Sequence, residues 1–307
     1  MLAEWRGETM GTHAHVVVDL AHAELLDRVE PRLDDWNRRW SRFRPDSEIA
    51  ALNAGGEVLV SPDTAALLAL AIDAWCLTDG LFDPTVHDAL VAAGYDRPFR
   101  DGHGPTAAPA PVPGLDGVSI DIESGLVTVP AGTRFDLGGI AKGHVADLLV
   151  GDLLADGATG AAVALGGDTA VGGRCPFAPA WPIHVEGHEQ PVARLEQGGF
   201  CFSTITRRRW PTPRGDAHHI LDPRTGRPTT TDVESAAVAA STAAAAEVLA
   251  TALIVEGRQA GLGRLEAMGL AGFVLTGDGG AIVDPDRGLN PRHPLLFALH
   301  PDGNRRG

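Results

Sequence analysis

The spacing of hydrophobic and polar residues predicts alternating strands and helices in the first half of the chain. A valine-rich stretch over residues 13–20 has the pattern of a strand, and residues 23–42 have the 3.6-residue period of an amphipathic helix with two tryptophans on one face. Residues 47–53 indicate a turn or short helix that leads to an apolar triplet. A second helix is predicted over 61–77, because Ser-Pro followed by an apolar run is a typical helix start.

The second half of the chain is richer in short strand patterns. A hairpin is predicted over 118–122 and 126–129. Residues 136–143 are predicted to open a helix that runs to about residue 154, and another helix is predicted from Ser241 onward. Further strands are predicted at 161–165, 181–186, 192–195, 200–204, 233–240, 272–275 and 281–283.

This order of elements favours an α+β fold. We expect one compact unit over residues 1–307, with a mixed, mostly antiparallel sheet and flanking helices. The stretch 101–117 is rich in Pro, Gly and Ala and has no periodicity, which predicts a surface loop, and about 286–307 is expected to be a C-terminal tail.

Composition narrows the classes of function. With 44% hydrophobic and 21% charged residues, the chain is able to bury a sizeable core. The net charge of −15 disfavours nucleic-acid binding, because neutralising phosphates requires a basic surface. An anionic ligand would therefore need a metal, a local cation or backbone N–H groups.

Cysteine usage and hydropathy predict a soluble, cytoplasmic protein. The three cysteines, Cys76, Cys175 and Cys201, are too scattered for a disulfide framework or a zinc site, which favours a reducing compartment. Residues 1–20 lack the basic and apolar regions of a signal peptide, and the run 236–255 is mostly alanine, so no membrane insertion is expected.

The first segment with candidate chemistry is Asp136-Leu137-Gly138-Gly139-Ile140-Ala141-Lys142-Gly143. Glycines at a helix start allow a ligand to approach the backbone, whose free N–H groups favour phosphate, and Lys142 adds a cation. Taken alone, the segment is equally typical of a glycine-rich helix start capped by Asp136.

Three other segments carry candidate side chains. His219 stands before a turn of sequence Asp-Pro-Arg-Thr-Gly and suits general-base chemistry, and Glu247 and Thr251 share a helix face where their oxygens suit a hard cation such as Mg²⁺. The turn over 80–86 combines an aromatic ring with an acid, which suits a planar base and its ribose. Each has an ordinary structural alternative: a core histidine, a solvated glutamate and a packed turn.

The ordered set of motifs resembles the ApbE family of FAD:protein FMN transferases over roughly residues 9–285. Its parts are Met-Gly-Thr at 10–12, SRFRPDSEI at 41–49 with Leu-Asn at 52–53, GLFDPTV at 80–86, DLGGIAKG at 136–143, LGGD at 165–168, Ser-Thr at 203–204, HILDPRTG at 219–226 and the helix segment 247–253. The segments DLGGIAKG and HILDPRTG are the most specific parts.

The resemblance implies roles for particular residues. His219 matches the histidine proposed to deprotonate an acceptor threonine. The positions that match the FAD pocket are Met10, Phe43, Leu81, Phe82, Asp83, Asp136, Lys142 and Leu221. Those that match the magnesium site are Gly139, through its carbonyl, together with Glu247, Ala250 and Thr251.

The implied activity is Mg²⁺-dependent transfer of the FMN half of FAD to a threonine of an acceptor protein, with release of AMP. The implied partners are FAD, as substrate, and an acceptor with its threonine in a Gly-Ala-Thr-like loop. Two alternatives remain open: an FAD pyrophosphatase that gives FMN and AMP, and an FAD-binding protein without catalysis.

Three features depart from the usual family pattern, and a fourth, at residues 157–159, resembles an acceptor loop. Glu247 occupies a position where Asp is usual, and Phe43 one where Tyr is common. Many relatives are exported lipoproteins, whereas no anchoring signal is recognised here. Residues 157–159 read Gly-Ala-Thr like an acceptor loop, but they are interpreted as a turn between a helix and a strand.

Overall fold

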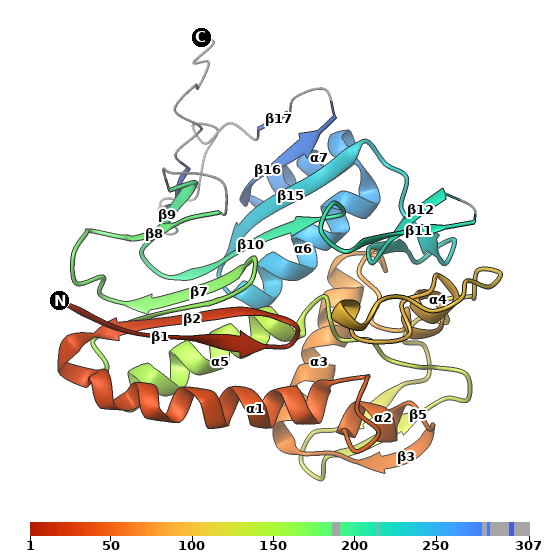
Figure 1. Cartoon of the computed structure of the whole chain (residues 1–307), viewed down its shortest axis with the longest axis horizontal. Helices are drawn as coiled ribbons and strands as arrows, with labels where there is room; N and C mark the ends of the chain where they lie inside the picture. The colour runs from red at the N-terminus through yellow and green to blue at the C-terminus, as the bar shows by residue number, and fades with distance from the viewer. Residues whose placement is uncertain (186–190, 214, 278–280, 283–294, 298–307) are drawn as a thin grey trace.

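The computed structural model describes residues 1–185, 191–213, 215–277, 281–282 and 295–297. It has an α+β fold built on one eight-stranded sheet, in the order β1-β2-β6-β7-β10-β15-β16-β17 (Figure 1). All pairings in this sheet are antiparallel. The predicted α+β class is therefore confirmed, without a parallel pair among the described strands.

The strands of the main sheet are β1 (Leu2–Thr9), β2 (Thr12–Asp19), β6 (Gly160–Leu165), β7 (Asp168–Gly173), β10 (Gly198–Thr204), β15 (Val233–Ala240), β16 (Ala271–Thr276) and β17 (Ala281–Ile282). The smaller sheets contain β3 (Gly56–Leu59), β4 (Ser119–Asp121) and β5 (Leu126–Val129); β8 (Trp181–Ile183), β9 (Ala193–Leu195) and β18 (Leu295–Phe297); and the hairpins β11 (Arg209–Thr212) with β12 (Gly215–His218) and β13 (Leu221–Asp222) with β14 (Arg227–Pro228).

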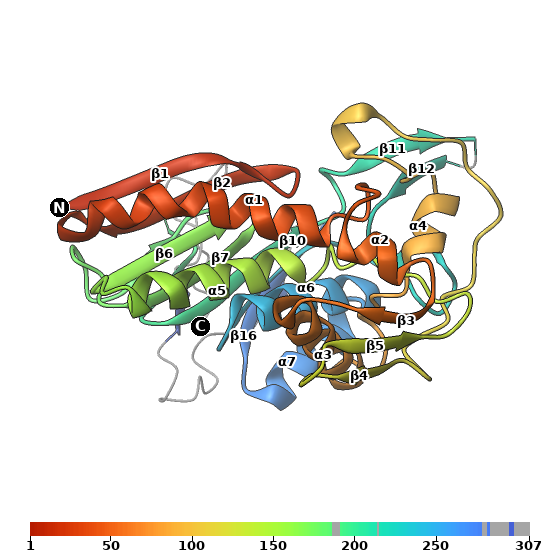
Figure 2. The same ribbon diagram turned by 90° about the horizontal axis from the view of Figure 1, so that it is seen from below.

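Helices cover one face of the main sheet (Figure 2). Helix α5 packs on β6 and β7, α6 packs on β10 and β15, and α1 runs beside α5. The α-helices are α1 (Val29–Trp40), α2 (Glu48–Leu52), α3 (Pro62–Leu77), α4 (His87–Ala92), α5 (Ala141–Ala155), α6 (Ala243–Glu256) and α7 (Arg258–Met268), and 3-10 turns span Leu20–Arg28 and Phe99–Asp101. The sheet of β8, β9 and β18 contributes Trp181, Ile183 and Leu195 to a second core, with side chains of the main sheet.

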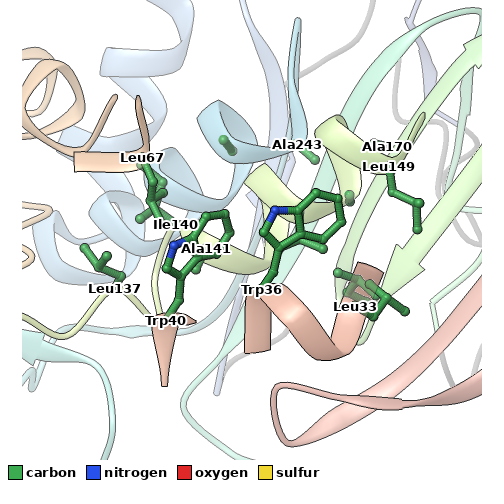
Figure 3. Close-up of a cluster of buried hydrophobic side chains, with 14 of the residues drawn as sticks. Leu33, Trp36, Trp40, Leu67, Leu137, Ile140, Ala141, Leu149, Ala170 and Ala243 are labelled. Carbon is green, nitrogen blue, oxygen red and sulfur yellow. The ribbon is translucent and has the colours of Figure 1, made fainter. Parts of the chain in front are cut away.

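The largest core lies between α1, α3, α5 and the main sheet (Figure 3). Trp36 and Trp40 stack with ring centroids 6.3 Å apart, as their four-residue spacing predicts. Each indole N–H finds an acceptor at the start of α3: Trp40 donates to Thr64 Oγ1 at 2.7 Å and Trp36 to Asp63 Oδ2 at 3.2 Å. These bonds tie α1 to α3 while the rings fill the core.

The contact between α5 and α6 depends on small residues. A Cβ on Gly143 would lie 2.5 Å from the Ala243 carbonyl, and a Cβ on Gly199 of β10 would lie 2.1 Å from the Ala243 nitrogen. Only glycine allows these three main-chain segments to approach so closely, because real Cβ atoms do not pack at such distances. The start of α6 is thereby fixed against both α5 and the sheet.

The predicted helices and most predicted strands are present with shifted ends. The sequence did not predict β1, β7, the β11–β12 hairpin, α4 or α7. The predicted surface loop corresponds to residues 102–118, which contain no helix or strand. The predicted strand ends at Glu186 and Val283 and the predicted tail at 286–307, apart from β18, lie outside the described residues. Within the described part of the chain, no helix combines the length and the apolar character needed to cross a membrane.

Candidate functional site

A buried cluster of charges forms where the start of α5 meets α6 and the β6–β7 turn. Lys142 forms ion pairs with Glu247 and with Asp168 Oδ2, the latter at 3.2 Å, and its Nζ donates to the Gly138 carbonyl at 2.9 Å. The Gly143 N–H donates to Glu247 Oε2 at 2.8 Å. The two motifs DLGGIAKG and LGGD, separate in the sequence, therefore meet at α6.

Burial and mutual charge shift the pKa values in this cluster. Glu247 and Asp168 are each 2% exposed. Burial, and next the charge of Asp168, raise the pKa of Glu247 to about 7, although Lys142 and the Gly143 N–H lower it. Burial lowers the pKa of Lys142, but the two carboxylates outweigh it and the net shift is upward, so the ammonium stays charged.

The oxygens around this cluster fit a hard cation. Thr251 lies one turn after Glu247 on α6, and Gly139 faces it, because a Cβ built on Gly139 would lie 4.0 Å from Thr251 Oγ1. Ala250 is buried beside them, and Asp168 Oδ1 is buried without a hydrogen-bond partner. No cluster of three or more His, Cys, Asp or Glu suited to a metal occurs in the described part of the chain. A cation here would thus combine one or two carboxylates with carbonyl, hydroxyl and substrate oxygens, as Mg²⁺ does.

The turn with Leu81, Phe82 and Asp83 packs against the same glycines. Its Phe82 ring lies 3.2 Å from the position of a Cβ on Gly139, and Leu81 joins the buried core around α6. Asp83 is buried and accepts from Thr85 N and Oγ1 at 2.7 and 2.6 Å and from Trp75 Nε1 at 3.1 Å. Burial raises the pKa of Asp83, while these bonds lower it. Its carboxylate therefore holds the turn together.

Asp136 and Phe43 are joined by Arg42, whose role the sequence did not reveal. The Arg42 guanidinium forms an ion pair with Asp136 and lies 4.2 Å from the Phe43 ring centroid and 4.7 Å from that of Tyr95. Asp136 Oδ1 also accepts from the Gly138 N–H at 2.7 Å. Asp136 thus organises the glycine turn, and Arg42 brings the aromatic segment beside it.

His219 follows β12 and lies in electrostatic reach of the cluster. Burial, and then the charges of Arg208, His218 and Lys142, lower the pKa of His219 to about 3, against a small rise from hydrogen bonding to the Arg208 main chain. Its Nδ1 is buried without a partner. The neutral imidazole is therefore the form present near neutral pH, as a general base requires. Neighbouring His218 instead bonds to the Thr229 carbonyl at 3.0 Å.

Leu221 and Met10 lie in two turns near the site. Leu221 is buried at the start of the predicted β-turn, in which Gly226 N–H donates to the Asp222 carbonyl at 2.9 Å. Met10 has φ of +49° in the β1–β2 turn, followed by Gly11 at +70°. The Gly166 N–H donates to His13 O at 2.8 Å, which places the β1–β2 turn next to the β6–β7 turn.

Thr159 lies far from this cluster. It occupies the turn after α5, as the sequence predicted, and its hydroxyl donates to Asp19 Oδ2 at 2.9 Å. Lys142 is in the first turn of α5, a helix of 15 residues. At about 1.5 Å per residue the two ends are roughly 20 Å apart, so Thr159 does not belong to the same site.

Two residues near His219 and Lys142 were not singled out from sequence. In the sequence Asp168 was interpreted only as part of a glycine turn, although an acidic residue directly after a buried strand can indicate a functional site. Arg208 stands in a run of three arginines, Arg207 to Arg209, which is unusual in a chain of net charge −15. Only the fold shows that it approaches His219 and Lys142.

Known proteins match this chain over most of its length. The FAD:protein FMN transferase of Treponema pallidum is 32% identical over 76% of this chain and 71% of its own length. That of Rhodobacter capsulatus is 29% identical over 91% of this chain, which spans only 56% of that protein. The crystal structure of the apo flavinyl transferase ApbE of Pseudomonas stutzeri aligns with a TM-score of 0.79 and 25% identity, covering 94% of this chain and 95% of that one. An ApbE protein of Thermotoga maritima aligns with a TM-score of 0.78 and 26% identity, covering 93% and 97%.

The sequence profile of the ApbE family matches residues 10–274, which include every predicted site residue. This range also contains six of the eight strands of the main sheet in whole or in part. The resemblance inferred from the eight motifs is thus confirmed, and the chain belongs to the ApbE family.

Proposed function

We propose that this chain is an FAD:protein FMN transferase that uses Mg²⁺ and a threonine hydroxyl as acceptor. The observation that carries the proposal is the Lys142–Glu247–Asp168 cluster beside the neutral His219. The relatives named above are FAD:protein FMN transferases, which supports the same activity here.

The residues of this chain divide the work between binding and proton transfer. The aromatic rings of Phe43 and Phe82 and the turn at Met10 suit the flavin and adenine, and the Gly138-Gly139 backbone suits the pyrophosphate. Glu247, Thr251 and the Gly139 carbonyl would hold the cation. When bound, Mg²⁺ supplies charge neutralisation on the phosphoryl oxygens.

In the reaction, the threonine oxygen of the acceptor attacks the phosphorus of the FMN half. A new P–O bond forms to threonine, and the bond from that phosphorus to the bridging oxygen breaks with its electron pair, so AMP departs. His219 accepts the threonine proton, for which its low pKa keeps it unprotonated. Water in place of threonine would give FMN and AMP, so the same residues would serve a pyrophosphatase.

An incubation with FAD and Mg²⁺ tests the proposal. An acceptor domain with a Gly-Ala-Thr loop is expected to gain the mass of FMN, with one AMP released per label, and the same domain with valine for that threonine to stay unlabelled. AMP released without acceptor supports hydrolysis, and bound FAD without AMP under any condition supports binding alone. If the acceptor stays unlabelled, hydrolysis of FAD or binding of FAD alone would each reject the proposed transferase activity.

We further propose that the chain acts as a single unit and meets its acceptor in the cytoplasm. All three cysteines are unpaired, which supports a reducing compartment. Fractionation of cells that express the chain would test this: enrichment of the protein and its labelled acceptor outside the cytoplasm would contradict it.

A further inference from the structure

Among the described residues, the Arg208 guanidinium has no partner, although it lies near the candidate site. Arg208 lies in the loop between β10 and β11, partly buried, and its guanidinium has no hydrogen bond or ion pair with any described residue. Its Nη2 lies 3.9 Å from the position that a Cβ on Gly11 would take, next to Met10 in the β1–β2 turn. In contrast, the next residue in the chain, Arg209, is paired with Asp216 at 2.9–3.0 Å.

Two other basic side chains, His219 and Lys142, lie near this guanidinium. The His219 side chain hydrogen-bonds to the Arg208 main chain, and the positive charge of Arg208 lowers the pKa of both His219 and Lys142, so the three residues lie close together. Holding a guanidinium near another cation, without a carboxylate of its own, is unfavourable unless an anion joins them. The arrangement is typical of a site whose anion arrives with the ligand.

Without Arg208, the charges of the proposed complex would sum to one net negative charge. With a cation bound, which favours the ionised form of Glu247, Asp168 and Glu247 carry two negative charges and Lys142 carries one positive charge. A divalent cation and the pyrophosphate of FAD, with two negative charges, cancel each other. The remaining net charge is one negative, which a single guanidinium neutralises.

We propose that the Arg208 guanidinium binds a phosphate oxygen of the FAD pyrophosphate and remains on the AMP phosphate as it leaves. This inference rests on the proposed function and adds a contact residue to it. A planar guanidinium offers paired N–H donors to phosphate oxygens and retains its charge at any working pH. It would stabilise the charge that develops on the leaving AMP in the same way as arginines in other phosphoryl-transfer enzymes.

The test compares ligands with and without phosphate on the full chain. Flavin fluorescence titrations give the dissociation constants of FAD and riboflavin for Arg208→Gln, Arg208→Lys and the control Arg209→Gln. For Arg208→Gln the FAD constant is expected to rise roughly 10- to 100-fold, the effect of one charge-assisted hydrogen bond. Arg208→Lys should lose less, because it keeps the charge. The riboflavin constant and the Arg209→Gln variant should be unchanged.

Three results would overturn the inference. Equal loss of FAD and riboflavin binding would make Arg208 a structural residue, and unchanged FAD binding would show that it does not touch the phosphates. A raised KM for the acceptor with unchanged FAD binding would assign it to acceptor docking. Because the titrations need no turnover, they separate failure of this inference from failure of FMN transfer itself.

Discussion

The contact between α5 and α6 at Gly143 should control both stability and the site. In Gly143→Ala, the new Cβ would lie 2.5 Å from the Ala243 carbonyl and 2.6 Å from the Ala244 nitrogen, all main-chain atoms that no side-chain rotation moves. The two helices must separate. The Gly143 N–H then moves away from Glu247 Oε2, its partner at 2.8 Å.

The magnitude follows from three terms. Overpacking costs about 1–3 kcal/mol, and a weakened hydrogen bond to a carboxylate costs about 1.5–3 kcal/mol. Replacing glycine by alanine in a helix returns about 1 kcal/mol. The net loss of unfolding free energy is therefore about 1.5–5 kcal/mol, measured by urea unfolding near neutral pH. The FAD dissociation constant should rise in parallel, because Glu247 and Gly139 lie at the same contact.

Gly151→Ala is the matched control on the same helix. Gly151 is exposed and has no atom within 4 Å of an added Cβ, so this substitution should stabilise the chain by about 0.5–1 kcal/mol. Opposite signs for the two substitutions would establish close packing as the cause. If Gly143→Ala unfolded at the wild-type urea concentration, or if both variants lost equal stability, the explanation from main-chain contact would be refuted.

Three further predictions concern single side chains of the site. His219→Ala should abolish FMN transfer and retain FAD binding. In the wild type the pKa of His219 is about 3, so its protonation should cause no loss of transfer between pH 8 and pH 5. An NMR titration in which this imidazole takes up a proton near pH 6.5 would contradict the prediction. Glu247→Asp should keep or raise Mg²⁺-dependent AMP release, whereas a collapse of activity would mean that the site is adapted to the longer side chain. Asp83→Ala removes three hydrogen bonds within its turn and should lower the unfolding free energy by about 2–3 kcal/mol in urea titrations, so wild-type stability would show that the turn holds without them.

Local patterns predicted those elements whose signals are carried by their own residues. The Ser61-Pro62 start gives α3 its N-cap, because the Ser61 side chain accepts from the Thr64 N–H. Strand β7 was missed because Gly172 and Gly173 weaken the strand signal, although its residues pair fully with β6. Strand β1 was missed because its alternating residues leave neither face strongly apolar.

Motifs located the site residues, but not the bonds between them. Lys142 and Glu247 are 105 positions apart, and their ion pair exists only because α5 and α6 touch at Gly143. Likewise, Arg42 and Asp136 are 94 positions apart in the sequence, and their ion pair helps to position the glycine turn. Such pairs leave no periodic signal, because each partner lies in a segment that is already explained by its own helix or turn.

The abundance of small residues explains both the weak sequence signals of some elements and the close contacts between distant segments. Alanine and glycine make the patterns of β7 and α6 weak, since they add little to a hydrophobic period. The same residues let α5, α6 and β10 approach at Ala243 until main-chain atoms meet, which sets Glu247 against Gly143. A chain with larger residues there would be easier to predict, but its helices would stand too far apart for this bond. The weakness of the sequence signal and the position of the candidate metal-binding carboxylate therefore have one physical cause.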